Sequence, residues 1–435
     1  MQIEDIYSLY LQHPSVQTDT RALKEGDLFF ALKGPNFNGN LFASQALEKG
    51  AAYVFVDEEV SVAGDRIIRV PDVLKTLQDL ARTHRMQFDT LPGGKSRIPF
   101  LAITGSNGKT TTKELIHAVL STTFKTCTTR GNLNNHIGIP LTILNIKADA
   151  EMAIIEMGAN HLHEIQGYCT YALPTHGLIT NCGKAHLEGF GSVENIRKGK
   201  GELFDFLRLH QGMAFVNADD PAVVALARGI SHLKSYGAHG TDLKGALIKS
   251  DPFAEVRVEG KEEMEIQTRL AGGYNLPNIL AAVCVGRFFG VEDSRIKAAI
   301  EGYQPSNSRS QLIKKGNNTV ILDAYNANPS SMKVAIENFA AMKENQNPKV
   351  LMLGAMKELG TDTQKEHQGI IDLIQKFSWR AVVLVGEEFQ GLGPRFIHLN
   401  NANEAGSWFK EENLENSLIL IKGSRSMQME KILEG

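Results

Sequence analysis

A short glycine-containing loop that ends in lysine has the clearest chemical capacity in the chain. Thr104-Gly105-Ser106-Asn107-Gly108-Lys109-Thr110-Thr111 follows an apolar run and opens a helical pattern. Glycines let a backbone wrap around phosphate oxygens, and the positive end of a helix attracts anions. Lys109 is expected to reach the terminal phosphates of ATP, and Thr110 to offer its hydroxyl to Mg²⁺. The loop from Gly105 to Thr111 therefore predicts a nucleotide site.

A carboxylate follows an apolar run later in the chain. Glu156 comes directly after Ala153-Ile154-Ile155, which is typical of a buried strand. Ligand sites in open α/β sheets lie at the carboxyl ends of strands, and Mg²⁺ prefers hard oxygen ligands. Glu156 is therefore predicted to bind Mg²⁺ together with Thr110. A helix-capping or surface carboxylate is the alternative.

Three α/β units are expected to position these residues. Residues 1–88 show the strand and helix patterns of a small N-terminal α/β domain, and the turn-rich residues 89–96 follow as a linker. Residues 96–305 alternate strands and helices, which predicts a central phosphate-loop-type domain with a mainly parallel sheet and helices on both faces. Residues 306–435 form another α/β domain, similar in pattern to a dinucleotide-binding fold. The predicted fold class is α/β with three domains.

The composition and charge of the chain limit the classes of protein to which it can belong. The 435 residues are 42% hydrophobic and 22% charged, with a formal net charge of −3, as in ordinary globular proteins. This charge gives no reason to expect nucleic acid as a partner.

An acidic N-terminus without an apolar run is no signal peptide, and no stretch approaches the roughly 20 apolar residues of a membrane helix. The four scattered cysteines fit free thiols in a reducing compartment. A cytoplasmic monomer without membrane insertion is expected.

The loop is shorter than the standard phosphate loop. The pattern G-x-x-x-x-G-K-[ST] would need glycine at the position of Ile103, so the segment could also be a glycine turn that caps a helix. The short form G-x-x-G-K-T resembles that of the Mur ligases and the folylpolyglutamate synthetases. Further segments resemble Mur ligase motifs in the expected order, from about Asp19 to Glu430.

Three of these segments resemble substrate-binding motifs of the Mur ligases. Thr18-Asp19-Thr20-Arg21, followed by Gly26-Asp27-Leu28-Phe29-Phe30, resembles the N-terminal domain that binds uridine diphosphate, which implies that Thr20 and Arg21 lie near that group. Gly131-Asn132-Leu133-Asn134-Asn135 and Tyr325-Asn326-Ala327-Asn328-Pro329 resemble the family member that adds D-alanyl-D-alanine. The substrate-binding residues that this implies are Asn134, Asn135, Asn326 and Asn328. A polar turn before a strand is the alternative for the first segment, and a structural turn is the alternative for the second.

Two motifs concern metals and an unusual lysine. Asn181-Cys182-Gly183-Lys184-Ala185-His186 resembles the motif with the family's metal-binding histidine, which implies that His186 binds a second Mg²⁺. Lys198-Gly199-Lys200-Gly201-Glu202 matches a K-G-E motif, which implies that Lys200 is carbamylated by CO₂ and binds metal. A carbamate supplies anionic oxygens where an ammonium would repel Mg²⁺. Lys198 is the competing position, and a solvated helix face is the alternative.

The remaining motifs concern the nucleotide and the C-terminal domain. The resemblance implies that Asn275 and Asn278 lie beneath the adenine, that Arg309 meets the γ-phosphate and that Asp323 holds the ribose. Helix caps or salt bridges are the alternatives. Arg425, in Lys422-Gly423-Ser424-Arg425, either meets a carboxylate of D-alanyl-D-alanine or caps the last helix. Leu353-Gly354-Ala355-Met356-Lys357-Glu358-Leu359-Gly360 resembles a family motif that usually has Asp in place of Ala355.

The resemblance implies an ATP-driven ligase that joins D-alanyl-D-alanine to UDP-N-acetylmuramoyl-tripeptide through an acyl phosphate. The implied catalytic residues are Lys109, His186, Lys200 and Arg309. A Mur ligase that adds the third peptide residue is the nearest alternative, but its D-N-P-R motif is absent. A folylpolyglutamate synthetase leaves the N-terminal unit unexplained, and a phosphate-loop switch would carry N-K-x-D, which is also absent. The sequence leaves open whether the third residue of the tripeptide is lysine or diaminopimelate.

Overall fold

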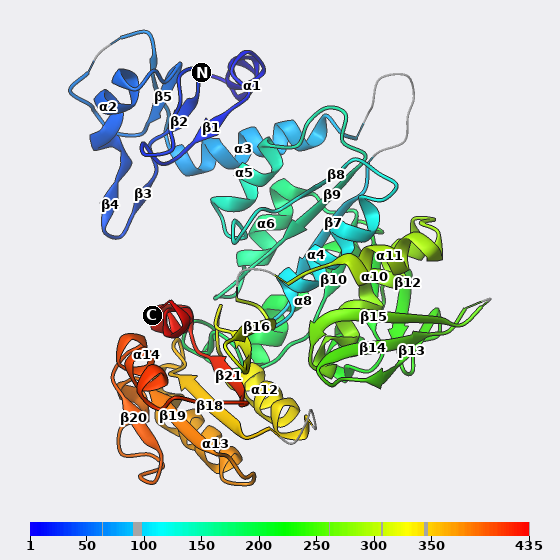
Figure 1. Ribbon diagram of the computed structural model, residues 1–435. Helices are drawn as coiled ribbons and strands as arrows, with labels where there is room; N and C mark the ends of the chain where they lie inside the picture. The colour runs from blue at the N-terminus through cyan, green and yellow to red at the C-terminus, as the bar shows by residue number, and fades with distance from the viewer. Residues whose placement is uncertain (63, 90–97, 261, 306–307, 343–346, 435) are drawn as a thin grey trace.

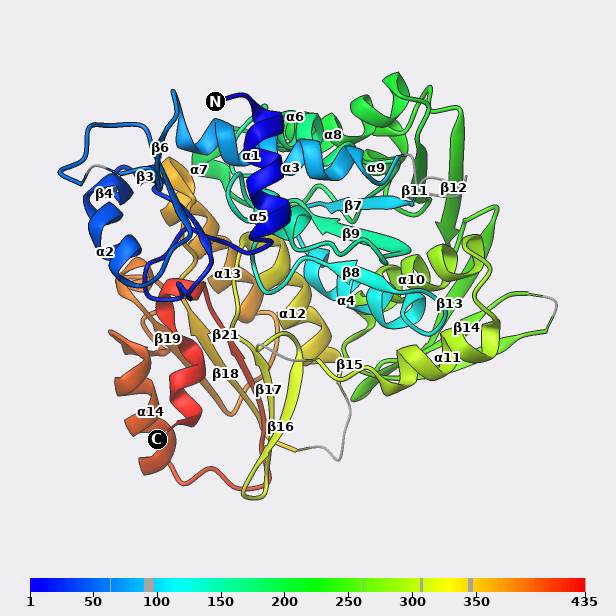
Figure 2. The ribbon, with the colours of Figure 1, turned by 90° about the horizontal axis from the view of Figure 1, so that it is seen from above.

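The computed structural model describes residues 1–435 except 63, 90–97, 261, 306–307, 343–346 and 435. In the described residues, three large sheets covered by helices follow one another along the chain, and β3 and β4 form a further two-stranded sheet in the first unit (Figure 1). Both ribbon views place the first and third of these units on one side of the second (Figures 1 and 2). The α/β class with three domains is confirmed. The predicted linker lies almost entirely outside the described residues, and the predicted domain boundaries stay predictions.

The N-terminal domain is built on a parallel four-stranded sheet of order β1-β2-β5-β6. Its strands and helices are α1 (Ile3–Gln12), β1 (Val16–Gln17), β2 (Leu28–Phe30), β3 (Lys33–Gly34), β4 (Phe37–Asn38), α2 (Ala43–Glu48), β5 (Tyr53–Val56), β6 (Ile67–Arg69) and α3 (Val73–Met86).

Helix α3 belongs to the predicted N-terminal unit but packs against the central domain. Arg85 is fully buried in α3 and donates to the carbonyls of Ala172 and Leu173 at 3.1 and 2.9 Å. Its guanidinium also lies over the ring of Phe100, 3.8 Å from the centroid. The helix therefore anchors the first domain to the second.

The central domain contains a nine-stranded sheet of order β15-β14-β13-β12-β11-β10-β7-β9-β8. It is parallel from β8 to β13, whereas β13, β14 and β15 pair antiparallel. The strands are β7 (Phe100–Thr104), β8 (Thr126–Thr128), β9 (Met152–Glu156), β10 (His176–Ile179), β11 (Met213–Asn217), β12 (His232–Gly237), β13 (Leu243–Lys249), β14 (Phe253–Val258) and β15 (Met264–Ala271). The sequence pattern does not predict the antiparallel extension.

Helices cover both faces of this sheet, as predicted. In β7, Phe100 and Ala102 belong to one apolar core while Leu101 and Ile103 belong to another, because alternate side chains of a strand point to opposite faces. The helices are α4 (Lys109–Leu120), α5 (Gly138–Leu144), α6 (Glu164–Ala172), α7 (Leu187–Phe190), α8 (Val193–Leu209), α9 (Pro221–Leu226), α10 (Leu276–Phe288) and α11 (Asp293–Gly302).

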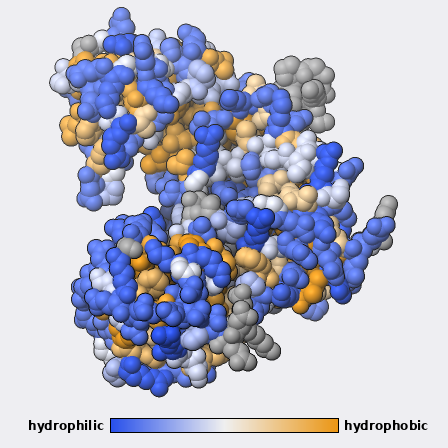
Figure 3. All heavy atoms as spheres, viewed as in Figure 1, coloured by the Kyte–Doolittle hydropathy of each residue, from blue (hydrophilic) through white to orange (hydrophobic). Residues whose placement is uncertain are grey.

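The C-terminal domain contains a six-stranded sheet of order β16-β17-β21-β18-β19-β20, parallel except for β16. Its strands and α-helices are β16 (Gln311–Lys315), β17 (Asn318–Asp323), α12 (Pro329–Ala341), β18 (Lys349–Gly354), α13 (Thr363–Ile374), β19 (Ala381–Val385), β20 (Ile397–Leu399), α14 (Ala402–Glu411) and β21 (Leu418–Lys422). On the face shown in Figure 3, an indentation separates this domain from the N-terminal domain. Among the described helices, none is long and apolar enough to cross a membrane.

Candidate functional site

The predicted phosphate loop connects the end of β7 to the start of α4. Gly105 has φ +140°, and a Cβ there would lie 2.0 Å from Thr180 Oγ1, so only glycine fits. Gly108 precedes the first residue of α4 with φ +81°, and a Cβ there would lie 2.7 Å from Asn278 Oδ1. The loop is therefore held in a conformation that places backbone N–H groups at a helix N-terminus.

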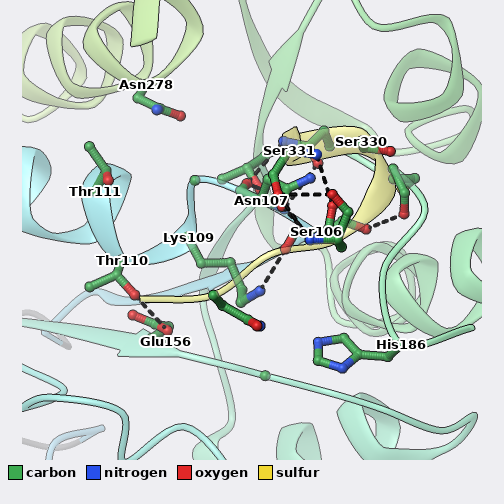
Figure 4. Close-up of a pocket in the computed structure, with 18 of the residues that line it drawn as sticks. Ser106, Asn107, Lys109, Thr110, Thr111, Glu156, His186, Asn278, Ser330 and Ser331 are labelled. Atoms are coloured by element: carbon green, nitrogen blue, oxygen red, sulfur yellow. Dashed lines mark hydrogen bonds between the residues drawn. The ribbon is translucent and has the colours of Figure 1, made fainter. Parts of the chain in front are cut away.

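Lys109 folds back along this loop. Its Nζ donates to the carbonyls of Gly105 and Ser106 at 2.7 and 3.2 Å (Figure 4). Burial lowers the pKa of Lys109 to about 8; the Glu156 carboxylate raises this pKa and Arg309 lowers it. A bound phosphate would stabilise the charged form, since an adjacent anion favours an ammonium.

Glu156 lies at the end of β9, beside the first turn of α4. Its Oε1 accepts hydrogen bonds from Thr110 Oγ1 at 3.1 Å and from Asn134 Nδ2 at 2.7 Å. Its Oε2 is buried without a hydrogen-bond partner in the described part of the chain, with Lys113 Nζ at 3.7 Å. A buried carboxylate oxygen with unused lone pairs, next to a threonine hydroxyl, suits a Mg²⁺ ion.

Lys200 is the buried lysine of the two candidates in its motif, and Lys198 is exposed. The Nζ of Lys200 donates to the carbonyl of Ala159 at 2.8 Å and lies 5.1 Å from the centre of the Phe190 ring. Burial, with a smaller contribution from the nearby cation of Lys109, lowers the pKa of Lys200 to about 7. A substantial fraction of this amine is therefore neutral near neutral pH.

His186 comes just before α7 and contacts the C-terminal domain. Its Nδ1 is hydrogen-bonded to Glu358 Oε2, and this bond lowers the pKa of Glu358. Within the residues placed by the structure, no three His, Cys, Asp or Glu side chains cluster as a ready metal site. The predicted two-metal set is therefore not preassembled from these residue types.

The predicted adenine residues lie behind the phosphate loop. Asn278 Nδ2 donates to Asn275 Oδ1 at 3.0 Å, and Thr112 Oγ1 donates to Asn278 Oδ1 at 3.0 Å. Asn275 in turn donates to the carbonyl of Ala271 at 3.0 Å. These bonds join the start of α10 to α4, so the two asparagines hold the nucleotide loop against the sheet extension.

Arg309 and Asp323 approach from the C-terminal domain. The guanidinium of Arg309 lies 3.5 Å from the centre of the Tyr325 ring, and its buried Nε lacks a hydrogen-bond partner in the part of the chain that the structure places. Asp323 accepts from Lys422 Nζ at 2.6 Å and from the Ser310 backbone N–H at 3.2 Å. Both side chains are therefore fixed in orientation at the domain boundary.

These residues surround one cavity of about 1090 Å³ between the central and C-terminal domains. The predicted site residues that line it are Ser106, Asn107, Gly108, Lys109, Thr110, Thr111, Asn134, Asn135, Glu156, His186, Asn275, Asn278, Arg309, Asp323, Asn326 and Asn328.

The structure does not bring the remaining predicted residues to the cavity wall. Gly105 and Lys200 lie behind its lining. Thr20 and Arg21 belong to the N-terminal domain, where the largely exposed Arg21 pairs with Asp19. Arg425 is also exposed and pairs with Glu430 at 2.6 Å.

The C-terminal domain touches the phosphate loop directly. Asn328, which caps α12 by accepting from the Ser331 N–H, donates through Nδ2 to Asn107 Oδ1 at 2.7 Å. Ser330 Oγ accepts from the Lys184 backbone N–H at 2.8 Å. Figure 4 shows Ser330 and Ser331 beside the loop residues Ser106 and Asn107. The two domains thus meet at the nucleotide loop.

Several charged residues near the site carry no prediction from the sequence. Lys113 follows Lys109 by one helical turn, and this spacing is a signal that could have drawn attention to it. Lys422 opens the motif that contains Arg425, but the sequence does not predict a role for it. The pairs Lys184–Glu366 and His186–Glu358 join distant segments and leave no such local signal.

Comparison with known proteins gives the family. Family models match residues 14–85 (Mur ligase family, catalytic domain), 103–286 (Mur ligase middle domain) and 308–425 (Mur ligase, glutamate ligase domain). The chain is 33% identical to the UDP-N-acetylmuramoyl-tripeptide--D-alanyl-D-alanine ligase of Bacillus subtilis (strain 168), over 96% of this chain and 92% of the relative. The chain belongs to the Mur ligase family. The resemblance drawn from the motifs is thereby confirmed.

Solved structures agree with this assignment. The Mur ligase described here superposes on MurF from Acinetobacter baumannii with a TM-score of 0.86 at 29% identity, covering 97% of this chain and 92% of that one. It is also similar to the MurF ligase from Thermotoga maritima in complex with ADP, with a TM-score of 0.85 at 26% identity over 98% and 97% of the two chains. All three domains of this Mur ligase are therefore arranged comparably to those of its relatives.

Proposed function

We propose that this Mur ligase joins D-alanyl-D-alanine to UDP-N-acetylmuramoyl-tripeptide at the expense of ATP. The observation that carries the proposal is the cavity that combines loop residues Ser106 to Thr111, the buried Glu156 carboxylate and Arg309 from the next domain. The name of the Bacillus subtilis relative and the ADP bound to the Thermotoga maritima relative support the same reaction.

The proposed reaction begins with activation of the acid. The tripeptide's terminal carboxylate attacks the γ-phosphorus of ATP, ADP leaves, and an acyl phosphate forms. The amine of D-alanyl-D-alanine then attacks the acyl carbon, and the tetrahedral intermediate expels inorganic phosphate as the amide forms. Lys109 and Arg309 would neutralise charge on the transferred phosphoryl group. Docking of the C-terminal domain on the loop would exclude water that otherwise hydrolyses the acyl phosphate.

The proposed metal residues are Thr110, Glu156, His186 and Lys200. When bound there, Mg²⁺ would supply positive charge that stabilises the transferred phosphoryl group. The neutral fraction of the buried Lys200 amine can attack CO₂, releasing one proton and leaving an anionic carbamate. Such a carbamate would convert a repulsive cation into an oxygen ligand.

The proposed substrate residues come from four separate segments in three domains. Asn134 and Asn135 lie on the central-domain wall, and Asn326 and Asn328 face them from the C-terminal domain. Thr20 and Arg21 are proposed to contact the uridine diphosphate, and Arg425 a carboxylate of D-alanyl-D-alanine. The proposals for these last three residues rest on motif resemblance.

The test measures product by mass and phosphate release from ATP. UDP-N-acetylmuramoyl-tripeptides with lysine or diaminopimelate at the third position are supplied, each with and without D-alanyl-D-alanine. We expect product only when both substrates are present. Product formed from UDP-N-acetylmuramoyl-dipeptide and a single diamino acid would instead indicate the ligase that adds the third residue.

The variant Lys109→Ala serves as the site test. We expect ligation to fall roughly 100- to 1000-fold, the range seen when one preorganised charge-stabilising donor is removed, while the far-ultraviolet circular dichroism spectrum is unchanged. Ligation at wild-type rate in Lys109→Ala would refute the proposed nucleotide site.

A further inference from the structure

One segment of the central domain lies between the phosphate loop and the C-terminal domain. On the loop side, Ser106 Oγ donates to the carbonyl of Gly183 at 2.7 Å. On the other side, Lys184 Nζ pairs with Glu366 at 2.6 Å, and the Glu188 N–H donates to the carbonyl of Glu358 at 3.1 Å. Residues 183–188 are thus held simultaneously by the nucleotide loop and by the C-terminal domain.

His186, within this segment, and Glu358, opposite it in the C-terminal domain, share an unusual backbone conformation. Their φ angles are +54° and +61°, in the left-handed region that residues other than glycine rarely adopt. Such conformations persist only where surrounding contacts determine them, and they concentrate at functional sites. Here the contacts are the His186 Nδ1–Glu358 Oε2 hydrogen bond and the adjacent Glu188–Glu358 backbone bond.

The hydrogen bond selects one form of the imidazole. A carboxylate only accepts, so Nδ1 carries the proton and donates to Glu358, which leaves the Nε2 lone pair available. His186 lines the cavity, and its ring extends from its loop into the site (Figure 4). Metal-binding histidines commonly donate their other ring N–H to a carboxylate, which fixes the ring and raises its basicity.

We propose that Glu358 is a positioning residue, which reaches across the domain boundary to orient His186 for metal binding. This inference rests on the proposed function in taking His186 as a metal ligand. Because Glu358 belongs to the C-terminal domain, His186 is set in its binding orientation only when that domain is docked. Closure of the ligase and orientation of this one metal ligand are then one event.

The chain supplies a matched control for testing this role. Glu358 and Glu366 both extend from the C-terminal domain to the same segment, but Glu358 pairs with His186 and Glu366 pairs with Lys184. In the full-length protein with ADP, Mn²⁺ binding is followed by electron paramagnetic resonance. We expect Glu358→Gln to weaken Mn²⁺ binding by about 10- to 100-fold, the usual cost of losing a carboxylate behind a metal-binding histidine, and Glu366→Gln to change it less than about threefold.

A double-mutant cycle separates positioning from simple domain contact. If Glu358 acts through His186, the double variant His186→Asn/Glu358→Gln binds Mn²⁺ no more weakly than His186→Asn alone. Fully additive losses, tighter Mn²⁺ binding in Glu358→Gln, or equal losses in the two glutamine variants would each overturn the proposal. The Mn²⁺ readout does not depend on the acceptor, so failure to ligate D-alanyl-D-alanine would count against the proposed function and not against this role.

Discussion

The Glu156 carboxylate shows how individual side chains prepare the site. It is almost completely buried, and transfer of a lone carboxylate out of water is costly. Thr110 and Asn134 satisfy one oxygen, and Lys113, itself buried, provides the nearby positive charge for the other. Lys113 also donates to the carbonyl of Thr129 at 2.7 Å, which fixes its position. The central domain therefore places a buried lysine beside the predicted metal ligand.

Replacing that buried lysine should destabilise the protein. We expect Lys113→Met to lower the free energy of unfolding by about 3–5 kcal/mol, because it leaves a buried charge without its partner. The exposed Lys125, paired with Asp149, is the control, and Lys125→Met should cost less than about 1 kcal/mol. Urea denaturation measures both. Equal losses in the two variants would show that Lys113 does not balance Glu156.

The buried Lys200 gives a pH dependence with a definite sign. Its pKa is lowered from 10.5 to about 7, so between these values the unfolded chain binds one more proton than the folded chain. Stability therefore rises with pH across that window, by at most about 1.4 kcal/mol per pH unit. In CO₂-free buffer, the free energy of unfolding of the wild type relative to Lys200→Met should increase from pH 7 to pH 9. A difference that stays constant would mean that Lys200 is not buried as a neutral amine.

At the scale of single elements, the nucleotide loop depends on the close approach of two strand ends. Strands β7 and β10 are parallel neighbours, and the residues after them, Gly105 and Thr180, come into contact. Thr180 Oγ1 donates to the carbonyl of Asn107 at 2.6 Å, so the end of β10 holds the loop in place. The conformation of the loop is therefore a property of the sheet as well as of its own glycines.

A methyl group at Gly105 should disrupt this support. In Gly105→Ala, a Cβ 2.0 Å from Thr180 Oγ1 and an unfavourable φ of +140° would displace the loop. We expect ligation to fall by roughly 100-fold, the scale of a misplaced reacting group. Gly167→Ala is the control, because Gly167 lies within α6 and an added Cβ would meet no atom within 4 Å. This variant should raise the free energy of unfolding by up to about 1 kcal/mol. Steady-state kinetics and thermal melts distinguish the two, and normal kinetics in Gly105→Ala would contradict the argument.

At the scale of the whole molecule, the catalytic cavity exists only where two domains meet. The N-terminus of α12 lies against the phosphate loop through Asn328, and Arg309 and Asp323 enter from the same domain. The first domain is instead attached through α3 and lies across the indentation of Figure 3. The phosphate loop therefore lies at the junction of the second and third domains, and the first domain is attached to the second at a separate junction.

The variant Asn328→Asp separates the two roles of this residue. Asp caps a helix as well as Asn does, so the thermal midpoint should stay within about 1 °C of the wild-type value. The carboxylate cannot donate to Asn107 and places negative charge beside the phosphate loop. We expect the KM for ATP to rise about tenfold with little change in stability. Unchanged KM would show that the Asn328–Asn107 contact does not form during turnover.

Residue patterns along the chain were sufficient to predict the fold class, the glycine-containing loop between a strand and a helix, and the family. These features are local in sequence: the alternation of strands and helices, and a glycine loop between one strand and one helix, are set by backbone geometry over a few residues. Local patterns do not distinguish Lys200 from Lys198, because both lie in the same motif. The structure distinguishes them, since Lys200 is buried and Lys198 is exposed.

Only the tertiary structure decided which charges face each other. His186 and Glu358 are 172 residues apart, and Lys184 and Glu366 are 182 apart, so no spacing rule links them. The antiparallel strands β13 to β15 likewise depend on pairing with the edge of a sheet formed elsewhere. The sequence determines a side chain's type and its local backbone conformation, whereas its desolvation and its partners depend on how distant segments pack.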